Sequence, residues 1–412
     1  MKKNKLICVN GDVNSNKYYH MEQVDNDTFH VKYGRVAGSE TTEIYPMSKW
    51  DSIYQKKTTR KNNPYKDVTE LFAESTNKVQ FREISSSTIR RIINDLQSYA
   101  KQSIIDNYTV SSASVTEKQV NIAQEVIDKL SSKTKLEESV KEINNLLLEL
   151  YQIIPRKLKK VQEHLVQNGT NLIINKSNLD FLKEIVTNEQ QTLDVMRGQV
   201  QLSIQTNSDS KEVTLLDSFG LKVEEINETE KQEIIQLLSD SANYFSSAIK
   251  VMNIHTQSRF NEWLNRQNDK RIKSLIHGSR NENFLNIAKI GLLIHPSNAV
   301  LTGALFGMGI YFANRAKKSI GYTSLENSYW AKGFSKKAYL GIFDVHTGNS
   351  FILKENDMFR NKTDYQYLKN SGYDSLWAKR GYNFGYSKLQ NDEITVYKKE
   401  QCTIKYLVEI KI

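Results

Sequence analysis

Three short stretches in the last third of the chain join an apolar run to a polar group that could serve in a ligand site. They are His277-Gly278-Ser279-Arg280, then Phe306-Gly-Met-Gly-Ile-Tyr311-Phe-Ala313, then Asn391-Asp392-Glu393. Each places an imidazole, a phenol or a carboxylate beside residues that favour a β-strand. Taken singly, a His beside a Gly is ordinarily a turn, and a Glu on a strand is ordinarily a surface charge. Their joint occurrence, in this order, favours an active site built from ordinary side chains.

Several other kinds of site are disfavoured by the same sequence. Gly307-x-Gly309 is not followed by a third Gly that opens a helix, and no P-loop occurs, which argues against a Rossmann dinucleotide site and against nucleoside-triphosphate hydrolysis. Cys8 and Cys402 lie far apart, with no CxxC pair, and the seven His form no HExxH pattern. A disulfide scaffold, a zinc site and metal catalysis are therefore not expected.

With Lys318-Ser319-x-x-Tyr322 between them, these stretches resemble the His-Tyr-Glu signature of the poly(ADP-ribose) polymerase catalytic domain. The resemblance implies a poly(ADP-ribose) polymerase that transfers ADP-ribose from NAD⁺ to proteins, including itself, with release of nicotinamide, and that DNA breaks stimulate. NAD⁺ is then a substrate, and no metal is required. Two alternatives stay open: a mono-ADP-ribosyltransferase, and a catalytically silent scaffold that binds DNA ends.

The resemblance also assigns roles to residues. Glu393, His277 and Tyr311 would be catalytic, with Glu393 hydrogen-bonded to the ribose 2′-hydroxyl. The Gly278 backbone and the Ser319 hydroxyl would hold the carboxamide, Tyr322 would stack on the nicotinamide with Tyr311 on its other side, and His277 with Ser279 would bind the adenosine end. The full predicted NAD⁺-binding set is His277, Gly278, Ser279, Tyr311, Phe312, Ala313, Lys318, Ser319 and Tyr322.

These residue types suit cleavage of the bond between nicotinamide and ribose. The reaction leaves an oxocarbenium-like ribose, so the site must grip a neutral aromatic amide and place negative charge near the anomeric carbon. Without a ligand role, Tyr311 and Tyr322 would be core aromatics and Ser319 a helix cap. The chain departs from the family at Leu293, Ala304 and Met308, where relatives often carry Arg, Tyr and Lys. Those departures bear on NAD⁺ affinity and inhibitor selectivity.

The rest of the chain predicts a multidomain α+β protein. Residues 1–80 favour a small β-sheet followed by a basic helix over 49–61, and Val31-Lys32-Tyr33-Gly34-Arg35-Val36 resembles the core of a WGR domain with Tyr33 in place of its Trp. Residues 81–254 favour an all-α bundle, which resembles the family's regulatory helical domain. Residues 255–412 favour a mixed α/β ADP-ribosyltransferase fold. This order of domains is that of the DNA-dependent members.

Local patterns give the expected elements. Capping boxes are expected at Thr116/Gln119 and Thr229/Gln232, because in each the Thr hydroxyl and the Gln side chain can satisfy first-turn amides. Apolar stripes at helical spacing predict further helices over 140–154 and 179–196. Strands are predicted over 310–313, 338–345, 350–353, 374–378, 393–397 and 406–412.

The net charge and the length of the apolar segments indicate which partners the protein can bind. The 412 residues carry a formal net charge of +10, distributed as +3 over 1–80, −4 over 81–254 and +11 over 255–412. Tyr33, Gly34 and Arg35 are the candidate contacts to DNA ends or nicks, since an aromatic ring and cations bind DNA without reading its sequence. The most apolar stretch, 301–313, is too short to span a membrane, and the apolar run near the N-terminus is too short for a signal peptide. We therefore expect no membrane association and a DNA-associated location inside the cell, nuclear or nucleoid.

Overall fold

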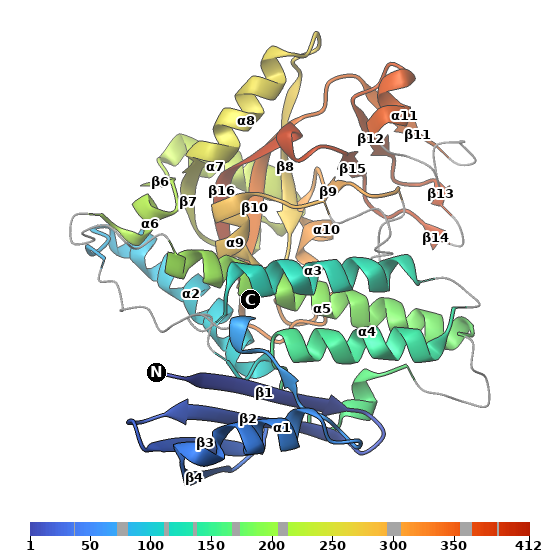
Figure 1. The fold of residues 1–412 in the computed structure, drawn as a ribbon. Coiled ribbons are helices and arrows are strands. Elements are labelled where there is room, and N and C mark those ends of the chain that lie inside the picture. Colours follow the sequence, from blue (N-terminus) through green and yellow to red (C-terminus); the bar gives the residue numbers. More distant parts are fainter. Residues whose placement is uncertain are drawn as a thin grey trace. The chain divides into compact units, whose positions relative to one another are not determined.

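The computed structural model describes residues 1–36, 38–71, 81–110, 115–134, 138–166, 174–204, 213–294, 306–354, 365–384 and 387–412 (Figure 1). They fall into two compact units. The first contains Met1–Lys78 and Gln102–Ile204, and the second contains Val79–Lys101, Gln205–Ser297 and Gly303–Ile412. Ala304 lies outside the described residues. Within those residues, no helix combines the length and the apolarity needed to cross a bilayer.

The first unit begins with an antiparallel sheet and a helix. Its strands, in the order β4-β3-β2-β1-β5, are β1 (Lys3–Asn10), β2 (Ser15–Gln23), β3 (Thr28–Arg35), β4 (Glu40–Pro46) and β5 (Lys66–Asp67). Alternate residues of β3 are buried, among them Phe29 and Val31, and they pack with Trp50 of α1 (Trp50–Thr58). A sheet and one helix therefore form where the sequence predicts them.

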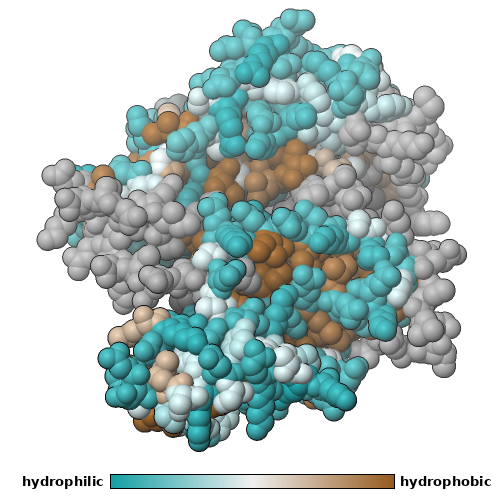
Figure 2. Space-filling view, in the orientation of Figure 1, coloured by the Kyte–Doolittle hydropathy of each residue, from teal (hydrophilic) through white to brown (hydrophobic). Residues whose placement is uncertain are grey.

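Among its described residues this unit also contains α3 (Glu117–Ser132), α4 (Val140–Ile153), α5 (Lys176–Ile204) and the C-terminal end of α2 (Ser87–Asn107). The expected capping box of α3 is present, with the Gln119 amide donating to the Thr116 hydroxyl. The Gln119 side chain also donates to the Ile153 carbonyl at 2.7 Å, which ties the start of α3 to the end of α4. Figure 2 shows apolar side chains gathered over these helices, whereas the sheet is mostly hydrophilic on the same face.

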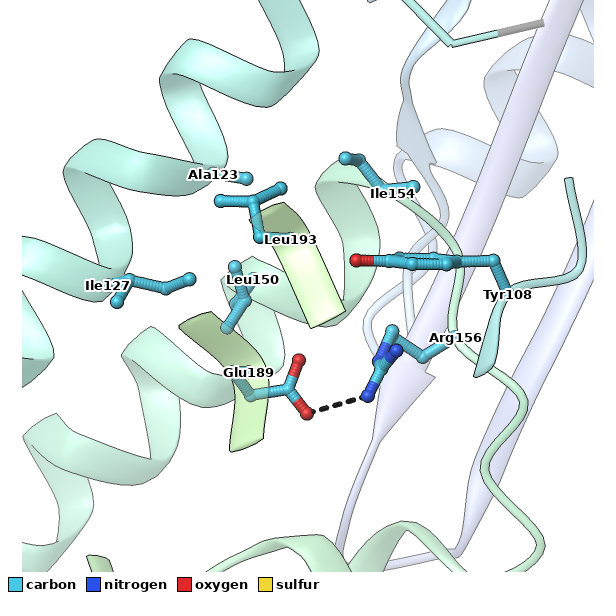
Figure 3. Close-up of a pocket in the computed structure, with 8 residues that line it drawn as sticks. All are labelled: Tyr108, Ala123, Ile127, Leu150, Ile154, Arg156, Glu189 and Leu193. Carbon is cyan, nitrogen blue, oxygen red and sulfur yellow. Dashed lines mark hydrogen bonds and ion pairs between the residues drawn. The ribbon is translucent and has the colours of Figure 1, made fainter. Parts of the chain in front are cut away.

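A small cavity inside the bundle contains a buried ion pair (Figure 3). Arg156 Nη2 lies 2.9 Å from Glu189 Oε1, and both side chains are less than a tenth exposed. The guanidinium carbon lies 4.7 Å from the centroid of the Tyr108 ring. Nε and Nη1 of Arg156 find no hydrogen-bond partner within the described part of the chain. The core of the bundle therefore contains the charges of Arg156 and Glu189, which are buried and paired with each other.

The second unit is built on two sheets. The larger has the order β6-β7-β16-β10-β8, with β6 (Leu221–Glu225), β7 (Phe245–Asn253), β8 (Ile272–Gly278), β10 (Lys337–His346) and β16 (Cys402–Lys411). The smaller has the order β11-β12-β15-β9, with β9 (Ile310–Phe312), β11 (Ser350–Leu353), β12 (Ser375–Ala378) and β15 (Glu393–Val396). A hairpin of β13 (Asn383–Phe384) and β14 (Ser387–Lys388) follows β12. All six predicted strands coincide with or overlap β9, β10, β11, β12, β15 and β16.

Short helices connect these strands: α6 (Leu215–Ser218), α7 (Glu228–Leu238), α8 (Ile254–Asn265), α9 (Phe284–Ile290), α10 (Ala316–Ile320) and α11 (Tyr365–Asn370). The capping box predicted at Thr229/Gln232 is wrong. Asn227 caps α7 instead, accepting from the Glu230 amide at 2.9 Å while the Glu230 carboxylate accepts from the Asn227 amide. An Asn followed by Glu three residues later satisfies the same amides, so the helix starts two residues earlier.

The larger sheet extends beyond the expected boundary at 254/255. β7 pairs with β16 and β6 pairs with β7, so residues 221–225 and 245–253 are strands of this sheet and not part of an all-α bundle. Residues 87–101 of α2 (Ser87–Asn107) also belong to the second unit. There Arg91 pairs with the buried Glu409 of β16. Periodicity in the sequence gave no sign of this attachment, because it depends on charged side chains far apart in the chain.

Substitutions at the buried Arg156–Glu189 pair should show how much each charge depends on its partner for stability. We expect Arg156→Met or Glu189→Met alone to lower the free energy of unfolding by about 3 to 5 kcal/mol, because each leaves one charge buried without its partner. The double variant should recover most of that loss. Urea unfolding followed by circular dichroism measures all three, with Lys160→Met of the exposed Lys160–Glu163 pair as the matched control. Single variants no less stable than this control would contradict the expectation.

Candidate active site

The site forms where the two sheets of the second unit meet. The backbones of Ile276 and Ala313 exchange two hydrogen bonds, each of 2.9 Å, which join the end of β8 to the residue that follows β9. One residue on, His277 Nδ1 lies 3.0 Å from the Tyr311 carbonyl oxygen. The His277 imidazole is thus held against the backbone of Tyr311.

The bond from His277 determines its tautomer. A carbonyl oxygen can only accept, so Nδ1 carries the proton and Nε2 of the neutral ring is left as an acceptor. Burial lowers the pKa of His277 from its usual 6.5, and the bond to Tyr311 opposes that shift only in part. Phe312 and Phe343 pack edge-on against the ring, with centroids 6.0 and 6.2 Å away. The imidazole is therefore fixed in orientation and neutral near pH 7.

Gly278 and Ser319 approach each other more closely than any other residue type would allow. A Cβ on Gly278 would lie 1.8 Å from the Ser319 carbonyl oxygen, which no side chain could tolerate. Ser319, on α10, is buried, and its hydroxyl donates to the Ile276 carbonyl at 3.0 Å. This proton is committed to the backbone, so the Ser319 oxygen can only accept from a ligand.

Glu393 lies on the same face of the smaller sheet as Tyr311. β15 pairs antiparallel with β9 so that Thr395 is opposite Tyr311, and side chains two residues apart on a strand share a face. The Glu393 carboxylate forms an ion pair with Lys318 of α10, and both side chains are less than a tenth exposed. Burial lowers the pKa of Lys318 to about 8, while the adjacent carboxylate favours its ammonium form. Tyr311 is therefore linked to His277 through its carbonyl oxygen and shares a sheet face with Glu393.

The hydroxyl of Tyr311 is engaged within its own loop. It donates to the Gly307 carbonyl at 2.7 Å and accepts from the Phe306 amide at 2.9 Å. Burial is the main cause that raises the pKa of this phenol. Both hydrogen-bonding directions of the hydroxyl are used, so Tyr311 offers a ligand its ring and not its hydroxyl.

The other predicted NAD⁺-binding residues differ in what they present. Phe312 and Ala313 are buried, and Ala313 uses its backbone to join the sheets, so both support the site from behind. Ser279 accepts a hydrogen bond from Asn283 at 3.0 Å. Of the residues where the chain departs from the family, Leu293 is exposed and Met308 is partly buried.

Tyr322 has a neighbour that sequence reasoning missed. The indole of Trp330 stacks on the Tyr322 ring, with centroids 4.4 Å apart and planes 14° apart. The aromatic pair Tyr329-Trp330, a few residues after Tyr322, was the available signal. Whether this pair contacts Tyr322 depends on the conformation of the loop between them, which the sequence does not show.

The residues predicted to bind DNA lie on β3 and are held by their own unit. Tyr33 packs on Tyr19, with centroids 5.5 Å apart, and donates to Glu43 at 2.7 Å. Arg35 donates to the Asn14 carbonyl at 2.7 Å and to the Lys159 carbonyl at 2.9 Å, which links the sheet to the segment after α4. A Cβ on Gly34 would lie 2.4 Å from the Ser39 carbonyl oxygen. Each residue thus has a structural role, whatever else it does.

Parts of the chain are similar in sequence to known proteins. Residues 226–412 match the poly(ADP-ribose) polymerase catalytic domain. The chain is 31% identical over 197 residues to the putative poly [ADP-ribose] polymerase-like protein 100L of Invertebrate iridescent virus 6, covering 46% of this chain and 98% of that protein. It is 34% identical over 204 residues to the uncharacterized protein 101L of the same virus, covering 50% of this chain and 80% of that protein. Against poly [ADP-ribose] polymerase 1 of Danio rerio it is 23% identical over 354 residues, covering 78% of this chain and 33% of that protein.

The matched domain takes NAD⁺ as its substrate, so the protein is an NAD⁺ ADP-ribosyltransferase. The chain belongs to the poly(ADP-ribose) polymerase family.

The state of His277 gives a prediction about pH. Since burial lowers its pKa below 6.5, the ring gains a proton only at lower pH, where Nε2 changes from acceptor to donor. We expect kcat/KM for NAD⁺ to be unaffected by this group at pH 6.5 to 7.5 and to fall below that range. The unfolded chain binds this proton more readily, so stability also falls as pH drops below 6.5. Melting temperatures from pH 4.5 to 7.5 should fall less in His277→Gln, and an acid limb of kcat/KM above pH 7 that this variant removes would contradict the assignment.

Proposed function

We propose that this ADP-ribosyltransferase builds poly(ADP-ribose) chains on proteins, including itself, and that DNA breaks stimulate it. The observation that carries the catalytic part is the buried carboxylate of Glu393. It shares a sheet face with Tyr311, and among the described residues Lys318 is the cation that pairs with it. A buried carboxylate of this kind can stabilise positive charge on a ribose far better than one in water.

Glu393 would act on the developing oxocarbenium-like ribose. It accepts a hydrogen bond from the ribose 2′-hydroxyl, stabilises the positive charge as nicotinamide leaves, and polarises the incoming hydroxyl. Lys318 keeps the carboxylate ionised where burial would otherwise favour its neutral form. The acceptor is either an amino-acid side chain or, during elongation, a ribose hydroxyl of the growing chain.

The nicotinamide subsite would be formed by Gly278, Ser319, Tyr311 and Tyr322. The Ser319 oxygen, whose proton is donated to Ile276, accepts from the carboxamide NH₂. The Gly278 backbone lies against Ser319 because no Cβ separates them, so both reach the same small group. The two tyrosine rings supply aromatic faces. Nicotinamide is thus gripped by groups that its ring and amide complement.

The adenosine end would be bound by His277 and Ser279. Nε2 of the neutral imidazole is an acceptor of fixed direction, which suits a ribose hydroxyl. Because the ring is held by Tyr311 and by two phenylalanines, binding costs little ordering of this side chain.

Glu393→Gln tests the catalytic assignment. We expect NAD⁺ turnover to fall about 10²- to 10³-fold, since one transition-state interaction of this type contributes roughly 3 to 4 kcal/mol. NAD⁺ binding, measured by calorimetry, should persist. Glu400→Gln makes the same change on the short turn that follows β15 and should leave turnover within about twofold. Unchanged turnover in Glu393→Gln would refute the role, and product length on a gel distinguishes polymer from single ADP-ribose units.

The DNA proposal rests on the first unit. Its five-stranded sheet with a flanking helix matches the order of elements that the WGR-like sequence implies. Lys49, Lys56 and Lys61 are exposed along α1 and its flanks, where ammonium groups can neutralise phosphates without reading sequence. The guanidinium of Arg35 already donates to the Asn14 and Lys159 carbonyl oxygens, so we assign the phosphate contacts to these lysines. Such a protein would be located with the DNA of its host.

The lysines can be tested together. We expect the triple variant Lys49→Glu, Lys56→Glu, Lys61→Glu to weaken binding to nicked duplex and to reduce the slope of log K against log salt by about 2 to 3, as about 0.9 is lost per phosphate contact. Fluorescence polarisation measures the slope, and NAD⁺ turnover with and without nicked DNA measures the stimulation. The same charge changes at the exposed Lys118, Lys141 and Lys176 of the bundle serve as control. Equal salt slopes for the two triple variants would count against the proposal.

A further inference from the structure

The Trp330 indole covers one face of the ring that we assign to nicotinamide. Its plane is within 14° of the Tyr322 ring at a centroid separation of 4.4 Å, which is close stacking and not an edge contact. Trp330 is 48% exposed, so much of the indole faces water. A phenol ring has only two faces, and with Trp330 in place one of them is already occupied.

The backbone holds the indole there. The amides of Trp330 and Ala331 both donate to the Gly321 carbonyl, at 2.9 and 3.1 Å. A Cβ on Gly321 would lie 2.5 Å from an indole carbon, so the Trp330 ring packs directly on the Gly321 backbone. Gly321 ends α10, the helix that carries Lys318 and Ser319. The Trp330 ring is therefore attached to the same short helix as two residues of the site.

The next residues of the loop hold it in the same shape. The Lys332 amide donates to the Ser328 carbonyl at 3.0 Å, and the Gly333 amide donates to the Ser328 hydroxyl at 2.8 Å. Lys318 Nζ lies 5.8 Å from the centroid of the Trp330 ring, so the indole also borders the cation that pairs with Glu393. These hydrogen bonds fix the loop in the conformation in which Trp330 stacks on Tyr322.

We propose that Trp330 is a positioning residue that fixes the plane of Tyr322 and leaves its opposite face for nicotinamide. The bound state is then a stack of three layers: indole, phenol and nicotinamide. Without the indole, Tyr322 would sample several orientations, and nicotinamide would have to order it on binding. This inference rests on the proposed role of Tyr322, and it concerns binding of the nicotinamide half of NAD⁺ more than the chemical step.

The test uses the full chain and two probes, nicotinamide and ADP-ribose. We expect Trp330→Ala to raise KM for NAD⁺ and the Kd of nicotinamide by about three- to tenfold, with kcat within about twofold. The Kd of ADP-ribose, which lacks the nicotinamide ring, should not change. Trp330→Phe should restore nicotinamide binding to within about twofold, because a second ring can stack. Gly321→Ala should reproduce the effect of Trp330→Ala, since its methyl group displaces the indole. Phe334→Ala, which removes a 91% exposed aromatic from the same loop, is the matched control.

The outcomes separate this inference from the function on which it rests. If Tyr322→Ala leaves nicotinamide binding unchanged, the nicotinamide site itself is misassigned. If Tyr322→Ala weakens nicotinamide but Trp330→Ala does not, only the role of Trp330 is refuted. Tighter nicotinamide binding by Trp330→Ala would show that the indole occupies the subsite, and would overturn the proposal. Equal weakening of nicotinamide and ADP-ribose would also overturn it, because a general structural loss does not distinguish the two ligands.

Discussion

Two backbone hydrogen bonds between Ile276 and Ala313 hold the rest of the site in place. They join β8 of the larger sheet to the segment that follows β9 of the smaller one, and so bring together residues more than 30 positions apart. His277 and Gly278 directly follow Ile276, and Tyr311 lies two residues before Ala313. Because backbone groups make the connection, side chains at this point are free to serve a ligand. There is no space for a side chain at position 278, since the Gly278 backbone already contacts Ser319.

A buried charge has to be stabilised before it can be useful. Glu393 is almost fully buried, and an isolated carboxylate in that position would take up a proton. Lys318 prevents this, but it comes from α10, while Glu393 comes from a strand late in the chain. The two are joined only because β9 and α10 follow each other directly and β15 pairs with β9. The fold thus provides one ionised carboxylate at low dielectric, which is the feature that glycosidic cleavage requires.

The sequence predicted those parts that local pattern controls. Strands such as Ser350–Leu353 and the helix cap at Thr116 follow from side-chain alternation and from hydrogen bonds within one turn. His277, Tyr311 and Glu393 could be identified from the sequence because each lies within a short motif. The attachment of Arg91 to Glu409 was not, since it joins residues more than 300 positions apart. The same holds for Arg35, whose carbonyl partners at Asn14 and Lys159 no local pattern reveals. Trp330 follows the recognised Lys318–Tyr322 motif closely, but its stacking on Tyr322 depends on the conformation of the loop between them.

The hydrogen bonds inside the site determine which ligand it can accept. Ser319 donates its proton to Ile276, His277 donates from Nδ1 to Tyr311, and the Tyr311 hydroxyl both donates and accepts within its loop. What these side chains still offer is a set of acceptors: the Ser319 oxygen and His277 Nε2, together with the Glu393 carboxylate. A ligand bound at these three acceptors must therefore bring hydrogen-bond donors. The carboxamide NH₂ and the ribose hydroxyls of NAD⁺ are such donors, and the Lys318 ammonium that pairs with Glu393 is the one cationic donor described beside these acceptors. The catalytic half thus has a strongly basic composition overall but an acceptor-rich centre, and this contrast explains how it can attract an anionic dinucleotide and still stabilise a cation where the bond breaks.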